Sequence, residues 1–305
     1  ERISGERISK GLISEERIEC GYRAEGYYDV CSTEEGLANA RHEASIIRRY
    51  GYHPEELDGE ELRRREPALS PDVLGGVFYP EAATLEPARF LARLRQAAGR
   101  QGLEVVEGIG VRGVETRSGR VVGVRTTDGE RVGADAVVVA TGAYSPRIAS
   151  KFGTRIPVQP GKGYHRDVDI GPNGAPTLRI ACVLNESSVF CTPMDTVVRF
   201  AGTMEFSGRN HVLRPARLRQ LSVAARAAFP GLGTARPKSE WCGLRPMPMD
   251  GRPTVGALPG VEGLVVATGH GMLGLPLAPV TGEIVTNLVL AVGDPRAEPL
   301  GPSRF

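Results

Sequence analysis

One arginine and two glycine-rich turns are the parts of this sequence whose residue types could do chemistry. Arg245 lies in the segment 241–253, which contains three prolines and is therefore stiff. A guanidinium is a planar fork of donors that fits a carboxylate. Two roles suit this residue: binding of a ligand's carboxylate, or a buried structural ion pair.

The pattern G-x-G-x-x-G occurs twice, and only the second copy has a suitable context. It consists of Gly269, His270, Gly271, Met272, Leu273 and Gly274. It follows an apolar run at 263–268 and precedes a helical pattern predicted at 279–292, so glycine backbone and a helix N-terminus could approach a flat ligand. No second strand or ribose-binding acid follows, and close packing of strand on helix is the alternative. His270 is a candidate acid or base, but a lone histidine in a glycine turn more often has a structural role.

The first copy, at 108–113, leads into a predicted hairpin rather than a helix. The dinucleotide fingerprint needs strand, loop and helix in that order, so this copy is rejected.

The elements that must position these residues follow from periodicity and turn signals. A helix is predicted from Pro87 to Gly99, and a second from Pro215 to Ala228. Between them, an antiparallel meander is predicted at 103–132, built from the runs Leu103–Val106, Val111–Thr116, Arg120–Thr126 and Glu130–Val132. The apolar run Ala136–Ala140 suits a strand buried on both faces, and the tight turn at Thr141 and Gly142 ends it.

The remaining segments are read more coarsely. Residues 1–50 read as polar helix and turn, with a short strand near Tyr27–Cys31. Residues 54–67 read as short helical pieces, and 155–206 as a β region. A closing helix is predicted from Pro279 to Val292.

Composition narrows the class of protein. A length of 305 residues with 41% hydrophobic residues predicts one large domain or two interleaved ones. A net charge of +2 argues against a nucleic-acid-binding protein. Five cysteines without a C-x-x-C pair argue against a metal site or a disulfide framework and favour a reducing, cytoplasmic setting. No apolar run reaches the ~20 residues of a transmembrane helix.

Several segments, taken in order, resemble the FAD-dependent oxidoreductases of the D-amino-acid dehydrogenase, glycine oxidase and sarcosine oxidase type. The matching segments are Ala140-Thr141-Gly142, 157–164, 243–246, 250–253, 269–274 and 278–283. This resemblance implies a mixed α/β fold, in which an incomplete glutathione-reductase-like FAD domain is interleaved with an antiparallel-sheet substrate domain. The implied division is a helical segment at 1–24, substrate domain at 25–80 and 149–240, and FAD domain at 81–148 and 241–305.

The resemblance also implies roles for particular residues. The region of Val111 would lie near the adenine of FAD. Ala140, Thr141 and Gly142 would line its pyrophosphate and ribityl chain. Gly271, Met272 and Leu273, within the turn from Gly269 to Gly274, would present N–H groups to the pyrimidine edge of the flavin. Arg245 would bind the carboxylate of the substrate, and no side-chain acid or base is required.

The implied activity is oxidative deamination of a small amino acid or secondary amine, such as a D-amino acid, glycine or sarcosine, with hydride transfer to flavin N5. Relatives begin with a strand, a G-x-G-x-x-G turn, a helix and a strand ending in an acid, which this sequence does not show. The alternative is therefore a non-catalytic remnant or subunit that needs a partner chain to bind FAD.

Overall fold

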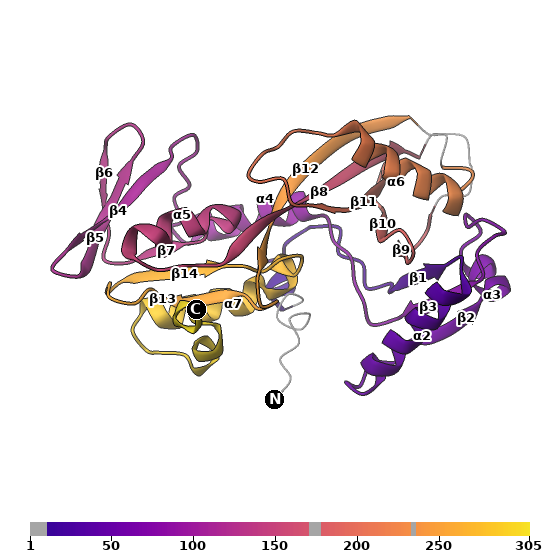
Figure 1. Ribbon diagram of the computed structural model, residues 1–305, viewed down its shortest axis with the longest axis horizontal. Coiled ribbons are helices and arrows are strands. Elements are labelled where there is room, and N and C mark those ends of the chain that lie inside the picture. The colour runs from indigo at the N-terminus through magenta and orange to yellow at the C-terminus, as the bar shows by residue number, and fades with distance from the viewer. Residues whose placement is uncertain (1–10, 171–177, 233–235) are drawn as a thin grey trace.

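The largest sheet of the computed structural model has eight strands, drawn from two distant parts of the chain (Figure 1). The structure describes residues 11–170, 178–232 and 236–305, so the expected start at residues 1–10 lies outside the described part. In spatial order the strands are β12 (Pro237–Pro248), β8 (Val158–Asp169), β11 (Val197–Glu205), β10 (Val189–Pro193), β9 (Cys182–Leu184), β1 (Tyr27–Cys31), β3 (Gly75–Tyr79) and β2 (Glu55–Asp58). All neighbours pair antiparallel except β9 and β1.

The register of this sheet fixes which side chains share a face. Trp241 pairs with His165, and His165 pairs with Ala201 of β11. Arg245 is four residues from Trp241 in β12, and side chains alternate along a strand, so Arg245 lies on the same face. We call the face that carries Trp241, His165 and Arg245 the site face.

The opposite face is covered by α6 (Pro215–Ala228) and α3 (Gly59–Arg65). Helix α6 begins at a proline, as predicted, and buries Leu218, Leu221 and Ala225 at helical spacing. These side chains belong to the main hydrophobic core, together with residues of the sheet.

At its far end the site face is covered by α2 (Glu34–Arg48). Thr33 caps this helix by accepting a bond from the Gly36 N–H, and two acidic residues in the first turn suit the helix dipole. Leu37 and Ala40 pack on β1 and β3. The strand near Tyr27–Cys31 is confirmed, whereas 54–67, expected to be helical, begins with β2 before α3.

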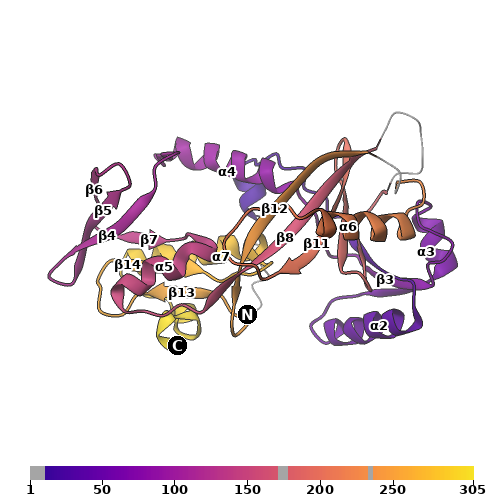
Figure 2. The same cartoon turned by 45° about the horizontal axis from the view of Figure 1, so that its top comes forward.

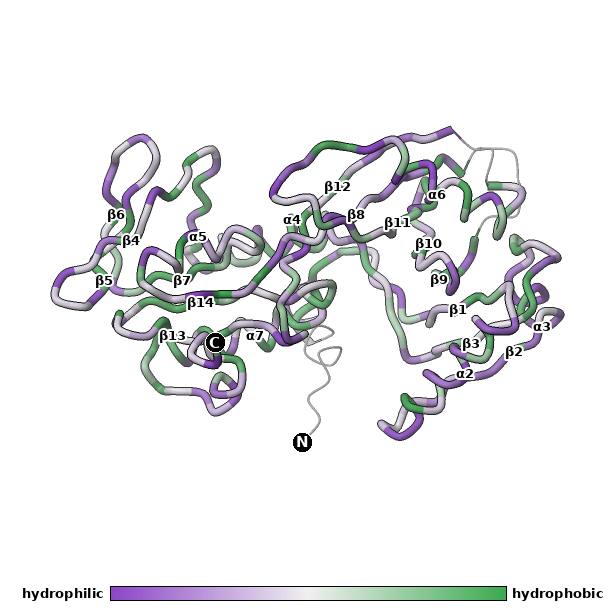
Figure 3. Tube along the Cα trace, in the orientation of Figure 1, coloured by the Kyte–Doolittle hydropathy of each residue, from purple (hydrophilic) through white to green (hydrophobic). Residues whose placement is uncertain are grey.

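A second layer contains the sheet β13 (Thr254–Ala257), β14 (Leu264–Thr268) and β7 (Val137–Val139), in which β14 and β7 are parallel. The predicted strand at Ala136–Ala140 is confirmed, but burial on both faces is not. Val139 is 3% exposed and Val138 is 39% exposed, because β7 lies at the edge of the sheet. Figure 3 shows β7 and β14 as largely hydrophobic segments.

The helices beside this layer include α7, which differs from its prediction. The helices are α5 (Ser145–Ala149), α7 (Gly274–Val289) and α4 (Pro87–Arg100), with single-turn helices at Gly142–Tyr144, Ser150–Phe152, Pro295–Leu300 and Pro302–Arg304. Helix α4 starts at Pro87, as predicted. Helix α7 starts five residues before Pro279, since the proline that signals a start also fits inside an early turn of this helix.

A separate antiparallel sheet contains β4 (Val111–Arg117), β5 (Arg120–Thr126) and β6 (Arg131–Gly133), which confirms most of the predicted meander. The run Leu103–Val106 was expected to be a strand and is not. It is irregular, and Leu103, Val105 and Val106 are exposed, so it lacks the pairing and burial that stabilise a strand.

Two long strands connect the layers. Strands β8 and β12 have 12 residues each and pair from one end to the other. Figures 1 and 2 show them running from beside β14 out to α6. Arg245 lies toward the β14 end of this ribbon.

Candidate active site

The Arg245 side chain lies over a pair of glycines in β12 and β8. Gly243 and Gly163 are register partners, one on each strand. A Cβ at Gly163 would collide with the Arg245 guanidinium, and a Cβ at Gly243 would collide with the Trp241 ring. The two missing side chains therefore create the room in which Arg245 and Trp241 lie on the site face.

Backbone, rather than an acid, holds the Arg245 guanidinium. Nη1 donates to the Thr203 carbonyl at 3.0 Å and to the Met204 sulfur at 3.8 Å. The side chain is half-buried, and burial lowers the pKa of Arg245. Among the residues that the structure describes, no carboxylate forms an ion pair with it. A desolvated cation of this kind favours an anionic ligand.

The Thr203 carbonyl is aimed at Arg245 by an irregularity in β11. The register between β11 and β8 shifts between Gly202 and Glu205, and Thr203 has φ +64°. This conformation is strained for a β-branched residue. The Thr203 hydroxyl is buried and makes no hydrogen bond within the described chain. The bulge places the Thr203 carbonyl and the Met204 sulfur beside the guanidinium.

Glu205 fixes the same bulge from the opposite face of the sheet. Its carboxylate accepts a bond from the Tyr164 hydroxyl at 3.0 Å and pairs with Lys162 at 3.2 Å, and Lys162 is fully buried. A hydrogen bond from Ser207, followed by those from Tyr164 and Lys162, lowers the pKa of Glu205 to about 2. The bulge is therefore anchored by an ionised, nearly buried acid.

The turn from Gly269 to Gly274 lies directly beside Arg245. Gly269 and Gly271 have φ values of +76° and +55°, which glycine adopts without strain. The Gly271 N–H donates to the carbonyl of Pro246 at 3.0 Å, so the turn is tied to the residue after Arg245.

The amides of this turn differ from the expectation for a flavin edge. Gly271 uses its N–H on Pro246, and Leu273 donates to the His270 carbonyl at 2.9 Å. Two of the three amides expected to face the flavin, those of Gly271 and Leu273, therefore already donate within the chain, and their contact with a flavin stays a prediction. The side chains of Met272 and Leu273 are 62% and 58% exposed.

His270 has a structural partner. Its Nε2 lies 3.0 Å from the Thr281 hydroxyl of α7, and burial lowers its pKa. Neutral imidazole at this position connects the turn to the helix.

A second turn meets the first at the edge of the three-stranded sheet. Ala140, Thr141 and Gly142 follow β7, and Gly142 has φ +53°. The Thr268 hydroxyl at the end of β14 donates to the Gly142 carbonyl at 2.9 Å. Because β7 and β14 are parallel, their carboxyl ends form one edge, where ligands bind in α/β proteins.

The structure thus brings together Arg245, the 140–142 turn and the 269–274 turn. Val111 is not part of this group, since it lies in the separate β4–β6 sheet with its side chain 49% exposed (Figure 1). Gly163 and Thr203 belong to the site but were not singled out from the sequence. The G-x-G spacing of Gly161 and Gly163 in a strand was an available signal of close approach, whereas the strain at Thr203 leaves no mark on the sequence.

A flat cofactor such as the flavin of FAD fits these turns. A Cβ at Gly142 would meet no atom within 4 Å, so the backbone there is open to a ligand. Helix α7 begins at Gly274 directly after the 269–274 turn and has no side-chain cap, so its first amides are available to a ligand. The exposed apolar side chains of Met272 and Leu273 suit a ring system better than water.

Comparisons with known proteins agree with this geometry. Residues 2–288 match the family model described as FAD dependent oxidoreductase. The D-amino acid dehydrogenase of Sinorhizobium medicae is 35% identical over 288 residues, which cover 93% of this chain and 68% of that protein. That of Vibrio vulnificus is 31% identical, covering 96% of this chain and 70% of the relative.

Solved structures give the same result. Glycine oxidase from Geobacillus kaustophilus superposes with a TM-score of 0.90 at 25% identity, over 99% of this chain and 81% of that one. Iminodiacetate oxidase from Chelativorans sp. BNC1 gives 0.85 at 25% identity, over 98% and 82%. Within the described residues, no helix is both long and apolar enough to cross a membrane. The family match over most of the chain and the identity to curated relatives lead to one conclusion: this chain belongs to the FAD-dependent oxidoreductase family.

Proposed function

We propose that this protein oxidises a small amino acid or secondary amine that carries a carboxylate, with FAD as the hydride acceptor. The relatives are named for D-amino acids, glycine and iminodiacetate. Each of these substrates has an amine one carbon away from a carboxylate.

The observation that carries the proposal is the state of Arg245. Its guanidinium is half-buried, bonded only to a carbonyl and a sulfur, and unpaired with any acid of the described residues. A structural ion pair, the alternative role, would need such an acid. A substrate carboxylate satisfies the remaining donors of the fork.

Six parts of the chain have roles in this proposal. Ala140, Thr141 and Gly142 and the 269–274 turn hold the flavin end of FAD, and Val111 remains a candidate contact of its adenine. When bound, FAD accepts a hydride at N5. Arg245 fixes the carboxylate and, through it, the position of the α-carbon; Thr203 orients Arg245. The N-terminus of α7 favours negative charge at the flavin edge by about 1 kcal/mol. Water then converts the released imine to an oxo acid and ammonia, or to an oxo acid and a primary amine where the substrate is a secondary amine, without a side-chain acid or base.

An alternative function is that this chain binds FAD only together with a partner chain or an additional unit. Strand β7 is an outer strand of the mixed sheet β13-β14-β7, and none of the described strands pairs with its free edge. Val138 on this strand is exposed. A strand beside β7 would extend the edge that carries both turns, so the alternative function is that of a subunit that binds FAD only with a partner.

The test replaces Arg245 by Ala and by Lys in an FAD-loaded preparation, after a visible spectrum has established loading. With an amino-acid substrate, Arg245→Ala weakens binding by roughly 2–5 kcal/mol, because a desolvated carboxylate loses its partner. Lysine restores part of the loss, since it lacks the fork. With the decarboxylated amine the variants and the parent perform alike. Unchanged KM and kcat for the amino acid in Arg245→Ala would refute the carboxylate role.

A further inference from the structure

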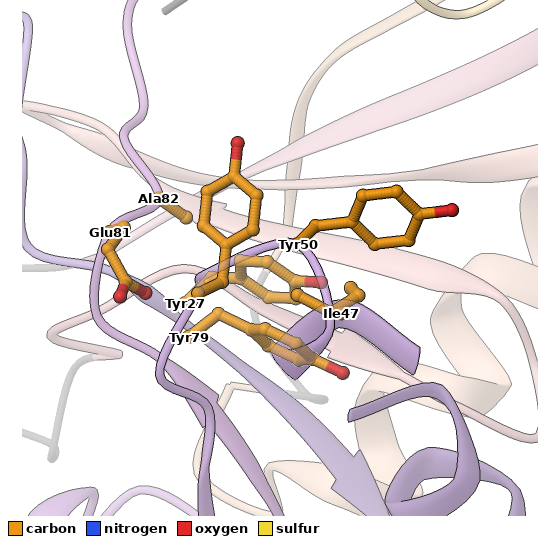
Figure 4. A pocket seen from close by; sticks show the side chains of 7 residues that line it. Tyr27, Ile47, Tyr50, Tyr79, Glu81 and Ala82 are labelled. Carbon is orange, nitrogen blue, oxygen red and sulfur yellow. The ribbon is translucent and has the colours of Figure 1, made fainter. Parts of the chain in front are cut away.

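A small hollow lined by tyrosines lies at the far end of the large sheet, under the end of α2. Its volume is about 250 Å³, and Tyr27, Ile47, Tyr50, Tyr52, Tyr79 and Glu81 line it (Figure 4). Strand β1, which carries Tyr27, lies five strands from β12, a separation of about 24 Å at the usual strand spacing. The hollow is therefore separate from the candidate active site. It is smaller than the 300–1,000 Å³ usual for drug-sized ligands, so it suits a small one.

The aromatic walls come from three segments of the chain. Tyr27 of β1 and Tyr79 of β3 are register partners, and their rings stack with centroids 4.8 Å apart and planes 14° apart. Tyr50 and Tyr52 follow the end of α2 and are 56% and 38% exposed. Figure 4 shows Tyr50 beside the stacked pair and Glu81 on the other side. Several aromatic rings around one hollow are typical of sites that recognise organic cations through the electronegative ring faces.

Among the described residues that line the hollow, the one charged residue is Glu81. His53 fixes the Glu81 carboxylate through its backbone N–H and its Nδ1, both 2.9 Å from Oε1. Burial, then the charges of Asp29 and Glu43, raise the pKa of Tyr79 to about 12. Both tyrosine hydroxyls of the stack therefore stay neutral.

Arg48 is a cation whose charge lowers the pKa of Tyr79, and its side chain is already engaged in other contacts. Arg48 pairs with Glu56 at 3.0 Å and donates to the Pro54 carbonyl at 3.0 Å. The potential within the hollow consequently favours a positive ligand over a neutral or negative one.

We propose that this tyrosine hollow binds a small alkylammonium ion through cation–π contacts with the rings and attraction to Glu81. Its apolar walls match N-alkyl groups, and a single carboxylate is too few ligands for a hydrated metal ion. The site needs no FAD and makes no use of Arg245, so it stands or falls independently of the proposed oxidation.

The experiment titrates the full chain with choline and with 3,3-dimethylbutan-1-ol, which has the same shape with carbon in place of the charged nitrogen. Saturable binding is followed by calorimetry and by saturation-transfer NMR. Choline is expected to bind at least tenfold more tightly than the alcohol. Equal affinity of the two compounds, or no saturable binding of choline, overturns the proposal.

Three variants locate the site. Tyr50→Leu and Tyr52→Leu keep apolar bulk on exposed side chains but remove the ring, and Glu81→Gln removes the charge; each is expected to weaken choline binding threefold or more. The control is Tyr144→Leu, which changes a tyrosine of similar exposure, 44%, outside the hollow. Circular dichroism verifies folding. Full choline affinity in both tyrosine variants of the hollow would place the site elsewhere and refute the assignment.

Discussion

The absence of side chains at two neighbouring glycines positions Arg245 as much as its hydrogen bond to the Thr203 carbonyl does. Gly163 and Gly243 face each other across β8 and β12 and leave a gap on the site face. The guanidinium occupies the part of the gap over Gly163, where the Thr203 carbonyl meets it. Gly163 is needed because any side chain there would overlap the guanidinium, and not because of its backbone conformation, since its φ is not positive.

The first prediction is that Gly163→Ala displaces the Arg245 guanidinium while the sheet remains intact. A methyl group at this site would overlap the guanidinium, so KM for an amino-acid substrate should rise at least tenfold, which corresponds to about 1.4 kcal/mol. Steady-state kinetics of the FAD-loaded enzyme measures this.

The matched control is Gly133→Ala in β6, where a Cβ would meet nothing within 4 Å. Its KM should equal that of the parent. A Gly163→Ala enzyme with the parental KM would show that the guanidinium is placed by something other than this gap.

The second prediction concerns Glu205 and the pH dependence of stability. Its pKa of about 2 lies below the ordinary value of 4.5. A depressed pKa means that Glu205 stabilises the fold fully above pH ~4.5, and that this contribution is lost as pH falls from there toward 2. Glu205→Gln leaves the buried Lys162 unpaired and should lower the free energy of unfolding at pH 7 by about 3–5 kcal/mol.

Urea unfolding at pH 7 and at pH 3 tests this, because the gap between parent and variant should narrow at the lower pH. Glu262→Gln serves for comparison, since its pair with Arg120 is exposed and should contribute under about 1 kcal/mol. A gap of the same size at both pH values would be inconsistent with the assigned role.

At the scale of elements, two glycine turns at the ends of β7 and β14 form the expected cofactor edge. Their glycines need positive φ, and the 269–274 turn is held by the bond from Gly271 to Pro246. The third prediction follows from this turn: Gly271→Val places a β-branched side chain at φ +55°, which costs roughly 1–3 kcal/mol, and puts bulk where the flavin edge is expected.

In a preparation whose parent binds FAD, with the partner at β7 supplied if binding needs it, the folded Gly271→Val variant should therefore lose FAD binding in a fluorescence titration. Gly208→Val is the matched control, with φ +78° and an open position outside both turns. It should show a similar loss of stability with normal FAD affinity. Normal FAD affinity in folded Gly271→Val would mean that this glycine serves only packing.

Periodicity predicted the elements well where one signal dominated. The helix from Pro87, the helix from Pro215 to Ala228 and the hairpin strand Arg120–Thr126 appear as predicted. Leu103–Val106 failed because a short apolar run does not reveal whether a partner strand exists. Pro279 misplaced the start of α7 because proline tolerates an early helical turn as well as the first position.

The sequence predicted only part of the candidate site, because some of its residues depend on contacts between distant segments. Arg245 and the 269–274 turn have distinctive sequence contexts, so they could be named in advance. Thr203 acts through its carbonyl and a strained φ, which depend on a bulge between strands far apart in sequence. The bond from the Gly271 amide to Pro246 likewise follows from a tertiary contact, whereas the Leu273 amide bonds within its own turn.

At the scale of the whole molecule, β7 gives the sheet β13-β14-β7 an edge with which none of the described strands pairs. Unpaired edges of apolar strands invite association with other chains. The fourth prediction is that the chain self-associates or binds its partner through β7, and that Val138→Lys reduces the associated fraction in sedimentation velocity by introducing charge at this edge.

Val132→Lys is the control, since Val132 lies on the edge strand β6 of another sheet and is 51% exposed. Association that falls equally in both variants would point to a general effect of charge. Without a partner at β7, the purified chain is expected to lack the yellow colour of bound flavin.

The hydrogen bond from Gly271 to Pro246 has a consequence for how such a site diversifies. It ties the proposed carboxylate anchor and the proposed cofactor turn into one rigid unit, so the distance between the held end of a substrate and the flavin edge would be the same for all substrates. Variation at Phe190 and Thr192 of β10, which line one hollow with Met272 and do not hold Arg245, can then alter which substrate side chain is accepted without moving that unit. Substrate range and reaction geometry are thereby free to evolve separately on the same sheet.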